Sequence, residues 1–355
     1  MDYYAGLDVS LKLTSVCVVD ENGKIVREAK VASEPGALIS FFVTLGLPIA
    51  RIGLEAGPLS QYLHAGLVEG DLDAVLLETR HVKAALSAMT VKTDRQDARG
   101  IAQLLRMGWF RPVHCKSIAA QEKRALLTAR KLLVSRLIDV EMSVRGILRG
   151  FGLKVGPTTK TTFADRVRAL IAGQTTLDRV IEPLLRCHAA LRTEFSVLHR
   201  QVLAVVRSDK VCKRLMTAPG VGPVTALAYV ATVDDPARFT SSRSVGPHFG
   251  LTPRKYQSGE TDVTGGITKA GDALVRSALY EAAMSMFCRS PMSVLKAWAM
   301  RVARRRGLKR AIVALARKLA TVLHRMWVDG TEFRWTGEAP VAPAARLIRR
   351  AAWNA

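Results

Sequence analysis

The chain has 355 residues, enough for two or three domains, and 49% of them are hydrophobic, enough for substantial cores. It carries 53 Lys and Arg against 30 Asp and Glu, and this formal net charge of +23 predicts a polyanionic partner, most simply nucleic acid. An anionic membrane surface is the alternative. It is disfavoured because we find no charge-free apolar run of transmembrane length and no signal-peptide pattern, so we expect no membrane contact.

The five cysteines are odd in number and scattered, and no two of them form a Cys-x-x-Cys pair. This pattern suggests neither a zinc site nor a disulfide framework. It fits a reducing compartment, and we expect a cytoplasmic protein.

The first apolar segment, residues 3–10, predicts a β-strand that carries one carboxylate, Asp8. Two β-prone segments follow at 15–20 and 25–31, and Asn22 with Gly23 between them is typical of a hairpin turn. We therefore expect three consecutive strands, with Asp8 on the central one. A buried carboxylate is costly unless it is paired, and a divalent metal is the usual partner where further acids converge. A solvated Asp at a strand end is the simpler alternative.

The next segments predict a short helix at 35–42 and a parallel strand at 51–54 that ends in Glu55. Open α/β sheets place their sites at the carboxyl ends of strands, so Glu55 is well placed to meet Asp8. A helix at 61–67 and a buried strand at 74–77 continue the same α/β unit.

A second pair of acids, Asp94 and Asp97, lies in a segment that predicts a helix start. Thr93 and Gln96 have capping-box spacing, and the helix would continue through 101–105. The two acids then share a face of its first turn. Acids in a first turn also suit the helix dipole, which is the simpler explanation for them. Their position in one α/β unit with Asp8 and Glu55 favours a shared site.

Residues 118–150 predict a long helix, and a second long helix lies near residues 191–205. Each carries apolar residues at 4-3-4-3 spacing: Leu133, Leu137, Val140, Val144 and Ile147 in the first, and Leu191, Phe195, Leu198, Val202 and Val205 in the second. Such spacing predicts a coiled coil, formed between the two helices or across a dimer. A loop at 151–162 leads into an irregular helical insert between them.

Residues 215–226 contain Gly220 and Gly222 and resemble a helix-hairpin-helix turn, in which Gly-x-Gly lets backbone N–H groups approach a phosphate. A tight helix–helix turn without a ligand is the alternative. A long stretch at 238–272, rich in Gly, Ser, Pro and basic residues, predicts a functional loop, which precedes a helix at 273–287.

Residues 282–328 contain no acid, which predicts a phosphate-binding surface rather than an ordinary solvated helix face. The residues expected to bind nucleic acid are Gly220, Gly222, Arg254, Lys255, Lys269, Arg301, Arg304, Arg305, Arg306, Lys309 and Arg310. The segment after Trp335 is rich in Ala, Pro and Arg, and we expect a poorly ordered basic tail.

Four acids on one α/β domain indicate two divalent ions, most simply Mg²⁺, acting on a phosphodiester. Their order along the chain resembles that of the RuvC-like, RNase H-type nuclease fold. Residues 6–10, 54–57 and 92–98 are similar to the three blocks of the DEDD-type insertion-sequence transposases. Residues 219–222, 250–259 and 266–271 are similar to the C-terminal domain of that family.

The resemblance implies a recombinase that inserts and excises its own mobile element in the bacterial cytosol, in association with the nucleoid. It implies a structured non-coding RNA, the bridge RNA, that pairs with target and donor DNA, and a tetramer or at least a dimer. It also implies a nucleophilic serine that forms a covalent link to DNA. We place this role on Ser258, with Ser241, Ser242 and Ser244 as alternatives, and expect Arg254 or Lys255 to neutralise the phosphate.

The expected fold class is α/β plus α. It comprises a RuvC-like metal-binding domain at 1–115 with Asp8, Glu55, Asp94 and Asp97, coiled-coil helices with an insert at 116–210, a mainly helical transposase domain at 211–335, and the tail at 336–355. Two other functions compete with the recombinase: a RuvC-like, metal-dependent, structure-selective DNA nuclease that uses water, and an architectural nucleic-acid binder with a degenerate fold.

Overall fold

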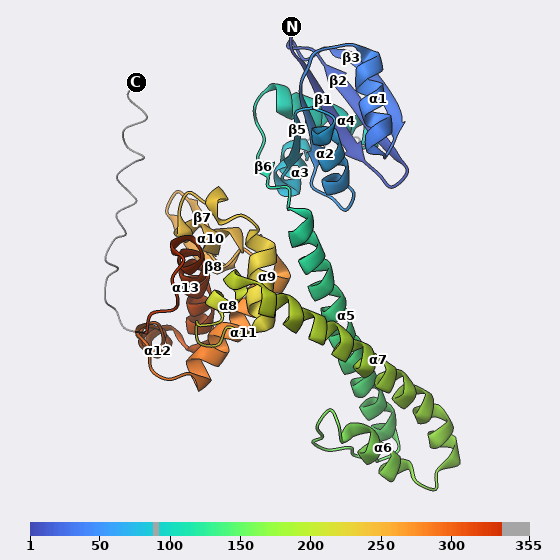
Figure 1. Cartoon of the computed structure of the whole chain (residues 1–355), viewed down its shortest axis with the longest axis vertical. Coiled ribbons are helices and arrows are strands. Elements are labelled where there is room, and N and C mark those ends of the chain that lie inside the picture. Colours follow the sequence, from blue (N-terminus) through green and yellow to red (C-terminus); the bar gives the residue numbers. More distant parts are fainter. Residues whose placement is uncertain (88–91, 336–355) are drawn as a thin grey trace. The chain divides into compact units, whose positions relative to one another are not determined.

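The computed structural model describes residues 1–87 and 92–335, and these divide into two compact units (Figure 1). The first unit is Met1–Ser117 and the second is Ile118–Ala355. The finer division into three domains and a tail stays a prediction, and the tail at 336–355 lies outside the described residues.

The first unit is built on one mixed sheet. Its strands are β1 (Tyr3–Val9), β2 (Leu13–Val19), β3 (Ile25–Ala32), β4 (Ile49–Glu55), β5 (Ala74–Leu77) and β6 (Pro112–Val113), in the order β3-β2-β1-β4-β5-β6. The first three strands form an antiparallel meander, and β1, β4 and β5 run parallel. This order is consistent with an RNase H-like fold. The predicted strands are confirmed, and Gly23 adopts a φ of 83° in the turn between β2 and β3.

Helices cover the two faces of this sheet (Figure 1). On one face, α1 (Pro35–Leu45) and α2 (Ser60–Glu69) pack their apolar residues on alternate residues of β1 such as Ala5 and Leu7. On the other face, α4 (Asp94–Arg106) lies over β1 and β2, and α3 (Thr79–Leu86) packs against α4. Side chains alternate along a strand, so Asp8 lies on the face of β1 that α4 covers.

Gly6 explains how α4 lies so close to β1. A Cβ atom at this position would stand 2.1 Å from the carbonyl oxygen of Ala98 and 2.4 Å from the backbone nitrogen of Ala102. Both are backbone atoms of α4 and cannot rotate away. Because Gly6 lies two residues before Asp8, the same close approach brings the start of α4 to the edge of the sheet where Asp8 lies.

The second unit begins with two long helices, α5 (Ile118–Gly150) and α7 (Thr175–Ser208), which pack against each other. The short helix α6 (Phe163–Ile171) lies in the insert and shares a small core with them, which includes Val144 and Ile181. Val144 and Val202 of the predicted heptad stripes are buried, whereas the other stripe residues are half-buried. The two helices are confirmed, and their coiled-coil packing stays a prediction.

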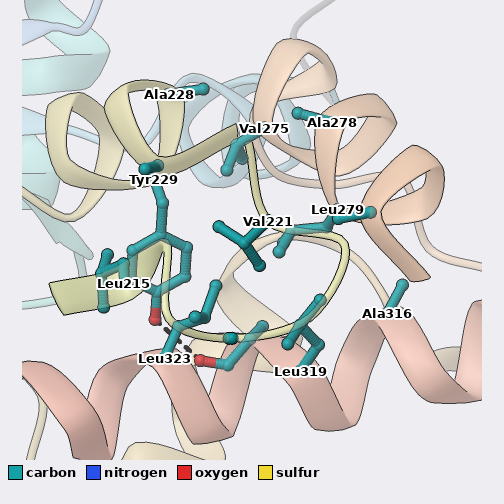
Figure 2. Packing of buried hydrophobic residues seen from close by; sticks show 14 of the residues in the cluster. Leu215, Val221, Ala228, Tyr229, Val275, Ala278, Leu279, Ala316, Leu319 and Leu323 are labelled. Carbon is teal, nitrogen blue, oxygen red and sulfur yellow. Dashed lines mark hydrogen bonds between the residues drawn. The ribbon is translucent and has the colours of Figure 1, made fainter. Parts of the chain in front are cut away.

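The rest of the second unit is a helical core. Its main helices are α8 (Lys210–Leu215), α9 (Pro223–Val233), α11 (Ala273–Arg289), α12 (Val294–Arg306) and α13 (Leu308–Asp329). Figure 2 shows Tyr229 of α9 and Leu319 and Leu323 of α13 converging in this core, with the Tyr229 hydroxyl donating to the carbonyl oxygen of Ala320 at 2.7 Å. Within residues 1–87 and 92–335, no helix is both long and apolar enough to cross a membrane.

The stretch at 238–272 differs from the expected loop. It holds two 3-10 turns, η1 (Pro236–Arg238) and η2 (Ser242–Ser244), the short helix α10 (Val245–His248), and an antiparallel hairpin of β7 (Pro253–Ser258) and β8 (Thr261–Ile267). Every residue of β7 is exposed, so no hydrophobic alternation marks the strand in the sequence. Backbone pairing and the positive φ of Gly259 at the turn form the hairpin instead.

Two glycines fix the base of this hairpin. A Cβ atom on Gly250 would stand 2.3 Å from the backbone nitrogen of Ala270, and one on Gly271 would stand 2.1 Å from the carbonyl oxygen of His248. The two chain segments therefore cross at backbone contact. Asp272, which caps α11, also pairs with Arg124 of α5, so the base of the hairpin is tied to the helical core.

Candidate active site

Asp8 and Glu55 lie at the carboxyl ends of adjacent parallel strands. Asp8 is the second-last residue of β1, and Glu55 is the last residue of β4. The backbone of β1 is paired with that of β4 up to Leu7 and Leu54, one residue before each acid. The register of the sheet therefore brings these two carboxylates to the same edge, as the sequence predicted.

Asp94 and Asp97 lie in the first turn of α4. The Thr93 side chain caps this helix, and its oxygen accepts a hydrogen bond from the Gln96 backbone N–H at 3.2 Å, which confirms the predicted cap. Asp94 is exposed and Asp97 is half-buried. Lys92, which precedes the cap, places its Nζ 3.9 Å from Asp97 Oδ2.

The four acids lie close enough for their charges to act on Asp8, although their side chains do not converge on one point. The pKa of Asp8 is raised from 3.8 to about 6, mainly by partial burial and then by the charges of Asp94, Asp97 and Glu55, while the charge of Lys92 opposes the rise. Burial also raises the pKa of Glu55, against a hydrogen bond from Thr79. Asp8 and Glu55 are therefore held where their ionised forms are disfavoured, and such sites often have a function.

The donor chemistry of this group suits a hard divalent cation, because all four side chains offer carboxylate oxygens. In the described parts of the chain, no three acid, His or Cys side chains stand close enough together to hold a metal ion. Binding would require the four side chains to turn toward one another. A cleft of about 390 Å³ opens beside Asp8 and Glu55 and gives them the space to do so.

Ser258 lies at the end of β7, next to the turn of the exposed hairpin. Within the described residues, its hydroxyl makes no hydrogen bond. Arg254 and Tyr256 lie on the same strand at alternate positions and so share its face, and Lys255 on the other face pairs with Asp262 at 3.2 Å. The carboxylate site and this serine belong to different units of the chain.

The three alternative serines have local structural contacts. Ser241 caps η2 by accepting from the Arg243 N–H, and the Ser244 hydroxyl donates to the Ser241 carbonyl oxygen at 2.6 Å. Ser242 lies 2.9 Å from Nδ1 of the buried His324, whose Nε2 lies 3.0 Å from the Pro236 carbonyl oxygen. Because that carbonyl can only accept, Nε2 carries the hydrogen and Nδ1 accepts from Ser242.

The predicted basic surface is exposed. Arg301, Arg304, Arg305 and Arg306 lie on α12, and Lys309 and Arg310 begin α13. All six side chains are exposed, and none of them forms an ion pair with another described residue. Arg254 and Lys269 are also exposed, at the hairpin and its base. Within the described residues, six cations at the α12–α13 corner are thus left uncompensated.

The geometry at Gly220 fits the alternative interpretation of this segment, a tight helix–helix turn that needs no ligand. Its φ is 80°, and an added Cβ atom would stand 2.3 Å from the Ala282 carbonyl oxygen of α11. Gly222 caps α9 and has open space around it. Phosphate binding at this turn stays a prediction. Sequence reasoning also missed Lys92 and Thr79, although Lys92 directly precedes the capping Thr93.

Comparison with known proteins gives matches along most of the chain. Residues 5–152 match a family model described as "Transposase" for the DEDD group of IS110, and residues 212–299 match the model of the transposase IS116/IS110/IS902 family. A putative transposase y4rJ of Sinorhizobium fredii is 33% identical, with 84% of this chain and 85% of the relative covered. The transposase of IS1111A from Coxiella burnetii is 28% identical over 90% of this chain and 87% of the relative.

A probable family 20 transposase of Pseudomonas aeruginosa is 28% identical, covering 93% of this chain and 98% of the relative. A solved structure of T. thermophilus RuvC with a Holliday junction substrate shares 15% identity at a TM-score of 0.26, covering 32% of this chain and all of that chain.

These matches define the class first: the chain is a DNA transposase, an enzyme that catalyses DNA transposition. Within that class, it belongs to the IS110 family of DEDD transposases. The family predicted from residues 6–10, 54–57 and 92–98 is thereby confirmed.

Proposed function

We propose that the protein is a recombinase that inserts and excises its mobile element with two chemical sites, the four carboxylates of the first unit and Ser258 of the second. The observation that carries this proposal is that the ends of β1 and β4 and the first turn of α4 bring Asp8, Glu55, Asp94 and Asp97 to one edge of the sheet. Burial, together with repulsion from the other three acids, raises the pKa of Asp8 to about 6, and the fold maintains this arrangement. Acids brought together in this way are unfavourable unless a ligand of opposite charge binds there.

The carboxylate site would hold divalent cations, most simply two Mg²⁺ ions, through Asp8, Glu55, Asp94 and Asp97. A bound cation supplies positive charge that stabilises the developing charge of a phosphodiester under attack. Asp8 and Glu55 would hold the cations from the sheet, and Asp94 and Asp97 would hold them from α4. The DNA backbone would then bind in the cleft beside Asp8 and Glu55.

Ser258 would make the covalent link. Its Oγ attacks phosphorus, the bond to the 3′-oxygen breaks, and the serine proton is transferred through solvent to the leaving 3′-hydroxyl. The 5′-phosphate is then esterified to Ser258, so the bond energy is kept for rejoining. Ser258 suits this role because its hydroxyl is exposed and has no described partner, unlike Ser241, Ser242 and Ser244. Arg254, on the same face of the strand, would neutralise the phosphate, whereas Lys255 lies on the other face and pairs with Asp262.

The basic corner of α12 and α13 would bind the phosphate backbones of donor and target DNA and of a structured guide RNA. Uncompensated arginines bind phosphates without reading bases. A guide RNA would read the sequence by base pairing, so the protein needs no side-chain code for its target. The protein would act on nucleoid DNA in the cytosol.

Assembly into dimers or tetramers would use the long helices. Leu132, Ile138 and Met142 of α5 are 53%, 54% and 59% exposed, and the heptad residue Leu137 is half-buried. These apolar side chains would be covered if α5 and α7 formed a coiled coil with a second copy. A tetramer of this kind could hold two DNA duplexes.

The test uses a DNA substrate nicked close to the cleavage site, so that a covalent protein–DNA intermediate is trapped. We expect mass spectrometry to find the adduct on the peptide that contains Ser258, and Ser258→Ala to abolish it while Ser241→Ala and Ser244→Ala retain it. If Ser258→Ala still cuts the DNA at the same rate and leaves no adduct, the carboxylates alone act with water, and the protein is the metal-dependent nuclease instead.

A further inference from the structure

Glu28 of β3 forms the main polar contact between the sheet and the first half of α4. It accepts hydrogen bonds from Arg95 Nε at 2.8 Å and from Arg99 Nη2 at 3.0 Å, and each of these arginines makes a second contact with it. The Glu28 side chain is 16% exposed. One carboxylate on a strand is thus gripped by two guanidinium groups on a single helix, in the charge-assisted geometry that is strongest for arginine.

The position of these arginines on α4 matters for the four acids. At about 100° per residue, Arg95 and Arg99 lie on one flank of the buried stripe formed by Ala98, Ile101 and Ala102. Asp97 lies on the opposite flank, and Asp94 lies at the helix start. A grip on the arginine flank therefore resists rotation of α4 about its axis, which would carry Asp97 away from the sheet edge.

Repulsion supplies a force that this grip must oppose. Asp94 and Asp97 in the first turn of α4 carry the same charge as Asp8 on β1, so without a cation their repulsion acts to push this turn away from the sheet. Farther along, the helix is held by Gln103, whose Nε2 donates to the Gly23 carbonyl oxygen at 2.7 Å. Among the described contacts, Glu28 holds the part of the helix that carries the acids.

We propose that Glu28 is a positioning residue that keeps Asp94 and Asp97 in register with Asp8 by clamping Arg95 and Arg99. The metal-binding part of this inference rests on the function proposed above for the four acids. Partners that orient metal ligands without touching the metal typically change metal affinity by about 10–100-fold when they are removed. Glu28 does not contact the acids directly and acts on them through the helix. We therefore expect a change in metal affinity of about 10-fold, the lower end of that range.

The first experiment needs no metal. Hydrogen exchange of the α4 amides is measured in the full chain, for the wild type and for Glu28→Gln, which keeps the shape but weakens the grip. We expect the amides of the first turns of α4 to exchange about 10-fold faster in the variant, with unchanged exchange in α1 and α2. Equal exchange in α4 would overturn the proposal, whether or not the wild type binds any cation.

The second experiment is a calorimetric titration of the DNA-free protein with Mg²⁺ and with Mn²⁺. Glu28→Gln raises the net charge by one and Arg99→Gln lowers it by one, so a purely electrostatic influence would weaken cation binding in the first and strengthen it in the second. A clamp predicts that both variants bind cations about 10-fold more weakly, and that the double variant is no worse than either. Opposite signs or unchanged affinity would overturn the clamp.

Two further variants guard against misreading these results. Asp73→Asn breaks the exposed Arg51–Asp73 ion pair of the same unit and should leave both exchange and metal affinity unchanged. Glu28→Asp keeps the charge and should restore part of the affinity if Glu28→Gln proves too unstable to study. If the wild type binds no divalent cation at all, the proposed function fails, and the exchange experiment alone decides the role of Glu28.

Discussion

The carboxylate site and the serine hairpin are built in opposite ways. Asp8 and Glu55 lie at the carboxyl ends of strands, their preceding residues Leu7 and Leu54 are fully buried, and α4 packs onto β1 at Gly6. Ser258 ends a strand in which every residue is exposed, in a hairpin whose base is fixed at Gly250 and Gly271. One site is thus positioned by the packed core of this chain, whereas the other stands on an exposed strand.

The two sites should therefore differ in how far their geometry depends on a binding partner. A site fixed by a packed core can be damaged by changes to that core. An exposed two-stranded hairpin gains little stability from burial, so under the proposed function its final geometry should depend on the partner that it binds.

The largest expected effect is at Asp8, the acid on the central strand. Asp8→Asn removes one charge from the centre of the site and should lower strand cleavage by about 10³-fold or more, which is about 4 kcal/mol of activation free energy. Cleavage is measured on labelled DNA, and binding is followed by fluorescence anisotropy, which should change little. Wild-type cleavage by this variant would show that the carboxylates are not the catalytic centre.

Gly6→Ala tests how far the fold fixes the carboxylate site. The added methyl group meets backbone atoms of α4 at 2.1 and 2.4 Å, so we expect a loss of about 3 kcal/mol in the free energy of unfolding. The matched control is Gly36→Ala in α1, where an added Cβ meets nothing within 4 Å. Denaturant unfolding measures both variants, and equal stabilities would mean that α4 adapts without cost.

The basic corner should behave like the hairpin, as a surface that acts only with a partner. Changing Arg304, Arg305 and Arg306 to Gln should weaken DNA binding by about 10–100-fold at moderate salt and leave thermal stability nearly unchanged. The dependence of log affinity on log salt should become shallower by about 0.9 for each phosphate that the variant no longer neutralises. An unchanged salt slope would place the DNA on another surface.

Ser242→Ala separates a structural serine from the proposed nucleophile. The change removes the hydroxyl that donates to Nδ1 of buried His324, so we expect a loss of about 1–2 kcal/mol in unfolding free energy. The trapped DNA adduct should still form, and Ser258→Ala should show the reverse pattern. If a stable Ser242→Ala protein formed no adduct, Ser242 would be the nucleophile and Ser258 would not.

The smallest effect concerns pH. Hydrogen bonds from Arg99 and Arg95 lower the pKa of Glu28 from 4.5 to about 2. Because the folded-state pKa is below the unfolded value, the stabilisation is complete above about pH 4.5 and is lost as the pH falls toward 2. After allowance for solvent screening, the free energy of unfolding of the wild type should exceed that of Glu28→Gln by about 1 kcal/mol at pH 7. This difference should disappear as the pH falls toward 2. If the difference in unfolding free energy stayed the same at all pH values, the ion pair of Glu28 could not be its cause.

Much of the carboxylate site could be predicted from the sequence because burial leaves a pattern. Apolar runs marked β1, β4 and β5, Asn22 and Gly23 marked the hairpin, and Thr93 with Gln96 marked the start of α4. Those local signals are enough to put Asp8 and Glu55 at one sheet edge. The close contact of Gly6 with α4 left no local mark, since it depends on a helix far along the chain.

The same reasoning explains why the hairpin strands and the contact of Glu28 could not be predicted from the sequence. The strands β7 and β8 are exposed and rich in polar residues, so they lack the alternation by which a strand is found in a sequence. The contact of Glu28 with Arg99 joins two segments that are separated in the chain, and the sequence alone gives no reason to pair them. Ser258 was chosen as the nucleophile because of the resemblance to a family. The structure added the local contacts of the alternatives, Ser241, Ser242 and Ser244.

The crossing of Gly250 and Gly271 has a consequence for how this protein can change over evolutionary time. Backbone atoms meet there, so neither segment tolerates an inserted residue or a side chain at the crossing. Toward the turn, the residues of both strands are exposed, and residues could be added or removed in pairs there without disturbing the helices. Relatives of this chain could therefore differ in the length of this one hairpin while the remainder of the enzyme stays as it is.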